Sequence, residues 1–268
     1  MNKPTRLYDA YIFDLDGTVY LGDALLPNAA AAIQTLRALG KRTVFLSNNP
    51  THSQNACAEK LTRLGLPTSP DDIIVSTAVM VTFLRQTMPR ARLFVIGEEP
   101  LCNALRDANF SLVENARETD AVIASFDRTF HYRKLQIAFD ALRAGARFFA
   151  TNADRYCPVP GGGEPDAAAI IAAIEACTNT RVEVVVGKPS RYMTDAILDL
   201  LQLPASHLLI TGDRLETDVQ MGLNAGMASA LTLTGATTRA ELDTAAIRPH
   251  FVLESLADLV PADQKTGA

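Results

Sequence analysis

Short runs of apolar, β-branched residues alternate with helical patterns along almost the whole chain of 268 residues. Such runs lie at Thr43–Leu46, Leu93–Ile96, Ala121–Ser125 and Leu208–Ile210. Strands that alternate with helices are typical of βαβ units, which build a parallel sheet with helices on both faces. The sequence therefore predicts an α/β protein with a Rossmann-like, doubly wound parallel-sheet core.

The octapeptide Tyr11–Thr18, with the sequence YIFDLDGT, is the most informative stretch. Asp14 and Asp16 follow an apolar run two residues apart, so in an extended chain both carboxylates leave the same face. Facing carboxylates repel each other unless a cation lies between them, and the hard ion Mg²⁺ prefers oxygen ligands. The alternative interpretation is a strand that ends in an acidic turn.

Further polar residues follow other predicted strands, namely Ser47, Lys188 and Asp213. In open α/β sheets, ligands bind at the carboxyl ends of the strands. These residues are therefore expected to converge on Asp14 and Asp16 although they lie far apart in the sequence. Taken alone, Ser47 also fits an ordinary turn, and Lys188 also fits a solvated lysine at a strand-to-helix junction.

None of these groups comes from the middle of the chain, although strands and helices continue through it. We therefore expect residues 81–183 to form an inserted, smaller α/β cap domain over the mouth of the site. Residues 1–80 and 184–268 would form the catalytic core. Within the insertion, Pro158 and Gly161–Gly163 predict a loop before a helix at Asp166–Cys177.

Composition excludes several classes of protein. Thirty acidic and 25 basic residues give a net charge of −5, which argues against binding to nucleic acid. There is no run of about 18 apolar residues, so no membrane span or membrane partner is expected. The N-terminal residues lack an apolar stretch, and the four cysteines are scattered without a CxxC pair. The expected location is the cytoplasm, with reduced thiols.

The residue types gathered here suit phosphoryl transfer. A carboxylate beside a divalent cation is a candidate nucleophile toward phosphorus and would form an aspartyl-phosphate. The reaction otherwise needs alignment and neutralisation of the phosphoryl oxygens, which Lys188 and Ser47 would provide. Asp16 would give a proton to the leaving oxygen and later take one from water.

Four motifs together resemble the haloacid dehalogenase-like hydrolases. They occur in that family's order: DLDGT at 14–18, LSNN at 46–49, GKPS at 187–190 and GDRLETD at 212–218. The position of the long insertion is similar to the class with a large α/β cap (C2 type). That class contains 4-nitrophenylphosphatases, phosphoglycolate phosphatases and NagD-type sugar phosphatases. The presence of Asp16 favours phosphate esters over haloacids.

The resemblance implies a role for each motif residue. Asp14 would be the nucleophile and Asp16 the acid and base. Mg²⁺ would be held by Asp14, the main-chain carbonyl of Asp16, and Asp213. The phosphate would be bound by Ser47, Asn48 and Lys188, and Asp218 would steady Lys188 or the metal's waters. In the cap, the candidates for contact with the leaving group are Asn152, Asp154 and Arg155.

The resemblance implies a Mg²⁺-dependent phosphomonoesterase that hydrolyses small phosphate esters, above all sugar phosphates, through an aspartyl-phosphate. The expected partner is a small phosphorylated metabolite, and because caps of this kind often support dimers, a second copy of the chain is a candidate partner. A dedicated phosphoglycolate or glycerol-phosphate phosphatase is one alternative. A non-enzymatic phospho-acceptor signalling domain is another, although it would need neither Asp16 nor a cap.

Overall fold

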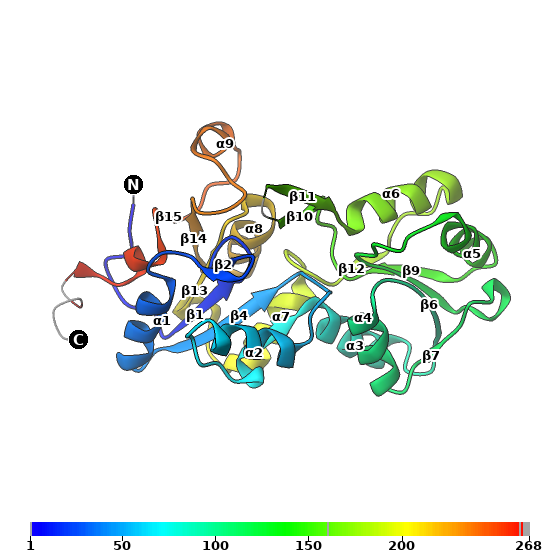
Figure 1. The fold of residues 1–268 in the computed structure, drawn as a ribbon, viewed down its shortest axis with the longest axis horizontal. Coiled ribbons are helices and arrows are strands. Elements are labelled where there is room, and N and C mark those ends of the chain that lie inside the picture. The colour runs from blue at the N-terminus through cyan, green and yellow to red at the C-terminus, as the bar shows by residue number, and fades with distance from the viewer. Residues whose placement is uncertain (1, 160, 263, 265–268) are drawn as a thin grey trace.

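The computed structural model describes residues 2–159, 161–262 and 264, and it contains two parallel sheets side by side (Figure 1). The larger sheet has six strands in the order β15-β14-β13-β1-β4-β5, and all neighbouring pairs are parallel. Its strands are β1 (Ala10–Asp14), β4 (Arg42–Ser47), β5 (Ile73–Val75), β13 (Leu208–Gly212), β14 (Ala228–Thr232) and β15 (Phe251–Leu253). This is the doubly wound core that the sequence predicts.

Alternating side chains of β1 pack against helices on opposite faces of the large sheet. Tyr11 and Phe13 belong to a buried cluster with α1 and α2, whereas Ile12 belongs to a cluster with α7, α8 and α3. Burial of each such side chain contributes about 1.5–3 kcal/mol. The helices are α1 (Ala29–Ala38), α2 (Gln54–Arg63), α3 (Ser76–Thr87), α7 (Arg191–Leu201), α8 (Gln220–Ala225) and α9 (Arg239–Thr244). Because both faces are covered, only the strand ends are open to a ligand.

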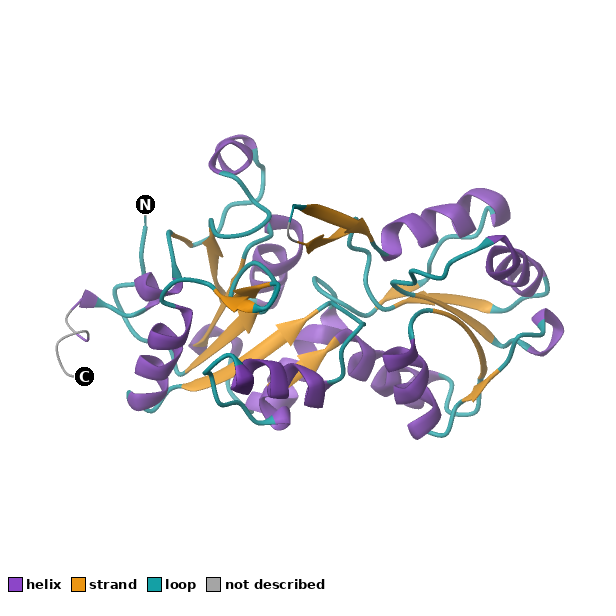
Figure 2. Cartoon of the chain, in the orientation of Figure 1, coloured by secondary structure: helices purple, strands orange, loops and turns teal. Residues whose placement is uncertain are grey.

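The second sheet has five parallel strands in the order β12-β9-β8-β6-β7. Its strands are β6 (Arg92–Ile96), β7 (Ser111–Leu112), β8 (Ala121–Ala124), β9 (Arg147–Ala150) and β12 (Val184–Val185). Helices α5 (Tyr132–Arg143) and α6 (Ala167–Thr178) cover one face, and α4 (Glu99–Asp107) packs with α3 on the other. The carboxyl ends of β1 and β4 point toward this sheet, which therefore forms a cap over them (Figure 2).

The two expected domain boundaries do not coincide with the ends of elements. The boundary at 80/81 falls inside α3, which continues to Thr87 because Met80, Phe83 and Leu84 keep its apolar face buried. The boundary at 183/184 leaves β12 outside the cap, yet Val184 and Val185 pair with β9. Helix α3 joins the two parts: the Phe83 ring lies 5.0 Å from the Phe149 ring on the cap side and 5.0 Å from the Tyr192 ring on α7.

Three local features differ from the sequence-based prediction. The predicted loop around Pro158 is an antiparallel hairpin of β10 (Tyr156–Val159) and β11 (Gly162–Pro165). A second small hairpin, β2 (Tyr20–Leu21) with β3 (Ala24–Leu25), follows the first motif. The GDRLETD motif contains a π-type turn at Leu215–Val219, directly before α8, and π-type turns are common at functional sites. Within the described ranges, no helix has the length and apolar character needed to cross a bilayer.

Candidate active site

The four sequence motifs meet at the carboxyl ends of three adjacent strands. Asp14 is the last residue of β1, Ser47 is the last residue of β4, and Asp213 follows β13 directly. Strand β1 lies between β4 and β13 in parallel register, so the three ends lie at one edge of the sheet. Lys188 reaches the same place from the loop before α7. The convergence that the sequence predicts is therefore present in the structure.

Lys188 is buried between two carboxylates. Its Nζ donates to Asp14 Oδ1 at 2.5 Å and to Asp218 Oδ1 at 2.7 Å, and only 4% of Lys188 is exposed. Burial alone would lower the pKa of Lys188, but Asp14 and Asp218 outweigh it and raise the pKa above its usual value. The ammonium group is thus held in its charged form, beside the carboxylate that the sequence predicts as the nucleophile.

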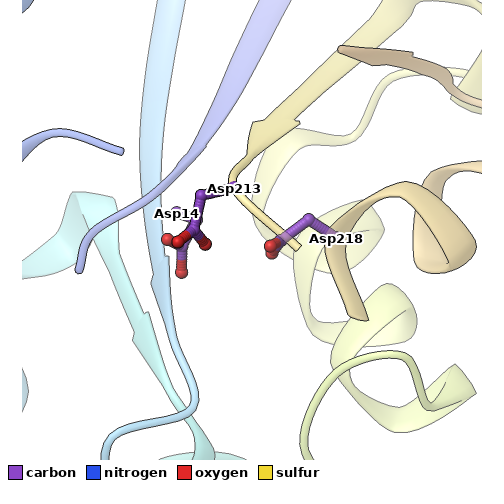
Figure 3. Close-up of side chains that lie close together, drawn as sticks. All are labelled: Asp14, Asp213 and Asp218. Atoms are coloured by element: carbon purple, nitrogen blue, oxygen red, sulfur yellow. The ribbon is translucent and has the colours of Figure 1, made fainter. Parts of the chain in front are cut away.

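Asp14, Asp213 and Asp218 form one acidic cluster. Their ligand oxygens lie within 4.8 Å of one another, and all three residues are buried. Figure 3 shows the three carboxylates pointing toward a common space, Asp14 from β1 and the other two from the segment after β13. Burial, followed by repulsion from Asp218 and Asp213, raises the pKa of Asp14 well above its ordinary value, against the opposing effect of Lys188. Burial and then Asp218 raise the pKa of Asp213 to about 6. One ammonium group does not balance three carboxylates.

The donor set of this cluster fits a hard divalent cation such as Mg²⁺. Asp14 Oδ2 is buried and has no hydrogen-bond partner, although Oδ1 of the same carboxylate is bound by Lys188. A buried carboxylate oxygen without a partner is costly unless a cation or a proton satisfies it. Asp14 and Asp213 are the carboxylates placed to hold the ion, as the sequence predicts. Asp218, predicted as a supporting residue, binds Lys188 and also lies within reach of the cation.

Glycine at two positions makes room for the Asp213 carboxylate. A Cβ added at Gly17 would lie 2.4 Å from Asp213 Oδ2, and a Cβ at Gly235 would lie 2.0 Å from it. Gly17 also has a positive φ of 86°, which other residues rarely adopt. The carboxylate is further held by the Ala236 backbone N–H, which donates to Oδ2 at 2.6 Å. These contacts leave the Asp213 carboxylate little room to move.

We predict that Gly235→Ala lowers kcat/KM by about 10- to 100-fold, the usual effect of disturbing the groups that orient a metal ligand. The new methyl group must displace Asp213, whereas the exposed loop tolerates the change, so the thermal unfolding midpoint should stay near that of the wild type. Gly162→Ala is the matched control, because its Cβ would meet nothing within 4 Å. Equal activity of the two variants at saturating Mg²⁺ would contradict this role for Gly235.

Asp16 is the residue that the family resemblance implies as the general acid and base. It lines the cavity that also contains Asp14 and Lys188. Burial raises the pKa of Asp16, with Lys60 and His52 acting in the opposite direction. The sequence alone does not indicate how the acid form of this carboxyl group would be favoured, and the partly buried position supplies a reason. The cavity is small, about 40 Å³.

Ser47 and Asn48 lie on the β4 side of the cavity and make different contacts. Ser47 Oγ accepts a hydrogen bond from the Asn49 backbone N–H at 3.0 Å. The side chain of Asn48 accepts from the Lys188 backbone N–H at 2.7 Å and donates to the Lys188 carbonyl at 3.3 Å. It also donates to Asp154 Oδ2 at 3.1 Å. Asn48 thus lines the cavity, and its side-chain amide also fixes the Lys188 loop and ties it to the cap.

The three predicted cap residues have different positions. Asp154 lines the cavity, as expected for a residue that contacts the leaving group. Asn152 is fully buried and donates to Asp166 Oδ1 at 3.1 Å, so it supports the start of α6 and does not line the cavity. Arg155 is exposed and lines a neighbouring cleft. The structure therefore does not support contact of Asn152 or Arg155 with a substrate in this cavity.

Several cavity residues were not predicted from the sequence. Arg214 and Thr217 belong to the GDRLETD motif, but their direction cannot be read from a turn. Tyr156 and Cys157 come from the hairpin that the sequence presents as a loop. Asp166 caps α6, and burial raises its pKa to about 6. Only Asp166 had a usable signal, since it is an aspartate at the start of a predicted helix.

Comparison with known proteins agrees with this geometry. A family model described as haloacid dehalogenase-like hydrolase matches residues 11–111, and a second, HAD-hydrolase-like, matches residues 185–259. The sugar phosphatase AraL of Bacillus subtilis is 39% identical over 92% of this chain and 90% of its own length. Glycerol-3-phosphate phosphatase of Gallus gallus is 32% identical over 95% of this chain and 91% of its own length.

Solved structures place the chain in the same group. The crystal structure of 4-nitrophenylphosphatase from Thermotoga maritima superimposes with a TM-score of 0.89 at 35% identity, covering 94% of this chain and 96% of that one. Likeness at this level extends over the core and the cap together. The chain therefore belongs to the haloacid dehalogenase-like hydrolases and, within them, to the phosphatases of the NagD and 4-nitrophenylphosphatase type.

Proposed function

We propose that this protein is a Mg²⁺-dependent phosphomonoesterase that hydrolyses small sugar or polyol phosphates through an aspartyl-phosphate on Asp14. One observation carries the proposal: the Asp14 carboxylate has one oxygen on Lys188 and the other without a partner, beside Asp213 and Asp218. Mg²⁺, held by Asp14, Asp213 and the Asp16 carbonyl, would neutralise the phosphoryl oxygens and align the ester.

In the first step, an Asp14 oxygen forms a bond to phosphorus while the bond from phosphorus to the ester oxygen breaks. The electron pair stays on the ester oxygen, which takes a proton from the Asp16 carboxyl group. Lys188 places its positive charge beside the phosphoryl group throughout. Ser47, at the end of β4, is placed to donate its hydroxyl to a phosphoryl oxygen.

In the second step, water attacks the phosphorus of the acyl-phosphate. Asp16, now ionised, takes the proton from this water, and the bond between phosphorus and the Asp14 oxygen breaks. Inorganic phosphate leaves, and both carboxyl groups return to their starting states. The cap lies over the strand ends and would limit the access of other water, so that hydrolysis would depend on the molecule that Asp16 activates.

The cavity favours a small, uncharged leaving group. Its wall includes Asp154 and Asp166 in addition to the carboxylates of the reaction centre, whereas its cations are Lys188 and Arg214. An excess of carboxylates repels an anionic leaving group and accepts hydrogen bonds from hydroxyl groups. A polyol or sugar phosphate therefore fits better than phosphoglycolate. The substrate would be a metabolite of the cytoplasm.

The test is phosphate release from a panel of small esters, with and without metal. We expect turnover of glycerol, triose and hexose phosphates with Mg²⁺, loss of at least 99% of it after chelation with EDTA, and recovery on adding Mg²⁺. Full activity after rigorous chelation would rule out the role of the metal. Inactivity toward the whole panel in the presence of Mg²⁺ would rule out the proposed activity.

The same panel separates the alternatives. A dedicated phosphoglycolate or glycerol-phosphate phosphatase would show one dominant ester, whereas a broad sugar phosphatase would show similar kcat/KM values for several. A phospho-acceptor domain would retain about one phosphate per chain without turnover. The cap and the position of Asp16 argue against that last alternative, because a stable acyl-phosphate needs neither.

A further inference from the structure

The cavity at Asp14 lies against a much larger cleft. The cavity has a volume of about 40 Å³, and the cleft has a volume of about 550 Å³. The cleft lies between the cap segment that starts at Ala153 and the core segments around Glu216 and Glu241. The residues that line both spaces are Asp154, Tyr156, Arg214 and Thr217. These four residues form the boundary between the reaction centre and the cleft.

Arg214 and Tyr156 join the core to the cap across this boundary. The Arg214 guanidinium donates from Nη2 to the Tyr156 carbonyl at 3.0 Å, and its carbon lies 4.8 Å from the centre of the Tyr156 ring. Arg214 belongs to the segment after β13, where its backbone N–H donates to Asp218 Oδ2 at 3.2 Å. Tyr156 begins hairpin strand β10. One side of the contact is thus fixed to the acidic cluster and the other to the cap hairpin.

The hairpin also fixes the ring of Tyr156. A Cβ added at Gly163 on β11 would lie 2.7 Å from Tyr156 Cδ2, so the ring rests directly on this glycine. On the cap side, Arg128 binds Glu164 of β11 at 2.9 Å and Glu98 at 2.8 Å. The contact therefore has defined geometry on both sides.

We propose that the Arg214–Tyr156 contact is the wall that limits the size of the leaving group. This inference rests on the proposed phosphatase activity and adds a specificity determinant to it. With the wall in place, an ester must fit its leaving group into the small cavity. With the wall removed, the cavity joins the cleft, and a leaving group as large as a nucleoside has room to extend past Asp154. Arg214 acts here as a specificity-determining residue and takes no part in the chemical steps.

The experiment compares two esters of primary alcohols, glycerol 3-phosphate and adenosine 5′-monophosphate, whose leaving groups differ mainly in size. In Arg214→Ala we expect kcat/KM for the nucleotide to rise about tenfold, through a lower KM, while kcat/KM for glycerol 3-phosphate stays equal or falls. Tyr156→Ala removes the ring but keeps the backbone carbonyl. It should change the kcat/KM values for the two esters in the same directions as Arg214→Ala does. Because 40% of the Tyr156 residue is exposed, this second variant is expected to fold.

Arg143→Ala is the matched control, since it removes an exposed arginine stacked at 5.5 Å on Phe139 of α5, outside both spaces. Arg143→Ala should leave kcat/KM unchanged for both glycerol 3-phosphate and adenosine 5′-monophosphate. If neither variant raises kcat/KM for the nucleotide, the wall is disproved, even if glycerol 3-phosphate is hydrolysed more slowly. That result would leave the phosphatase activity in place. Failure of the wild type to release phosphate from either ester would overturn the proposed function and this inference together.

Discussion

Asp14→Asn is expected to abolish phosphate release, with kcat lowered on the order of 10⁵-fold, as for removal of other covalent nucleophiles. The amide retains the size of the carboxyl group but loses the negative charge that pairs with Lys188 and that makes the oxygen a nucleophile toward phosphorus. The measurement is single-turnover release of inorganic phosphate at saturating Mg²⁺. Freshly prepared protein is needed, because deamidation of the amide would restore the wild-type carboxylate.

Asp16→Asn is the matched control for this prediction, because it makes the same change two residues away. It removes the proton donor and the base but leaves the nucleophile, so turnover should fall while some phospho-enzyme still forms. Acid quenching with a ³²P-labelled ester should show labelled protein for Asp16→Asn and none for Asp14→Asn. Near-normal turnover of Asp14→Asn, with its mass confirmed as the amide, would assign the nucleophile to another residue.

The difference between these two aspartates could be predicted from the sequence only in part. Their spacing of two residues places both at the end of a strand, and the structure confirms that Asp14 ends β1. The two carboxyl groups nevertheless have different surroundings. Asp14 belongs to the acidic cluster, whereas Asp16 lines the cavity and is affected by the charges of Lys60 and His52. Those surroundings depend on α2 and the cap, which no local pattern around residue 14 records.

The rule that ligands gather at the carboxyl ends of parallel strands predicted the core of the site. It holds for Ser47 and Asp213 because β4 and β13 are the immediate neighbours of β1. In the cap, Asn152 was selected by the family resemblance and not by this rule, and it does not line the cavity. Asn152 follows its strand as expected, but its amide binds Asp166 at the start of α6. A polar residue at a strand end can therefore serve a helix cap as well as a ligand.

The cap is where prediction from sequence failed most often, and the causes are physical. Hairpin β10–β11 contains two prolines and two glycines, whose β propensity is low, so cross-strand pairing and contact with the core hold it in place. The Arg214–Tyr156 contact joins residues 58 positions apart in sequence. Helix α3 crosses the expected boundary because one apolar face packs on both sheets. Each feature depends on tertiary contacts that local patterns do not encode.

The role of Asn48 shows how the two parts of the molecule depend on each other. Its side chain holds both the N–H and the carbonyl of Lys188, and it reaches Asp154 in the cap. Gly187 allows this close approach, since a Cβ there would lie 2.6 Å from Asn48 Oδ1 and 2.5 Å from the Thr151 carbonyl. The position of Lys188 is thus set by the same side chain that contacts the cap, so Lys188 and the cap should move together.

Lys188→Met is expected to lower kcat about 10³-fold and to destabilise the fold by about 3–5 kcal/mol, since it leaves buried carboxylates without their cation. Methionine keeps a comparable length of unbranched chain, so lost packing contributes little to either effect. The chain should still fold, and Mg²⁺ should recover part of the lost stability by binding Asp14 and Asp213. Urea unfolding with EDTA and with Mg²⁺ measures the two contributions to stability separately.

Lys134→Met provides the control for Lys188→Met. Lys134 also binds a buried carboxylate, Asp127 at 2.5 Å, but it lies in the cap and is itself 23% exposed. Asp127 keeps two further donors, the Thr129 backbone N–H at 2.8 Å and the Thr129 hydroxyl at 2.7 Å. Lys134→Met should therefore destabilise the fold less than Lys188→Met does, and it should leave kcat unchanged. If Lys188→Met retained kcat within about fivefold of the wild type, the ammonium group would be a structural counter-ion only, and phosphoryl transfer would depend on another cation.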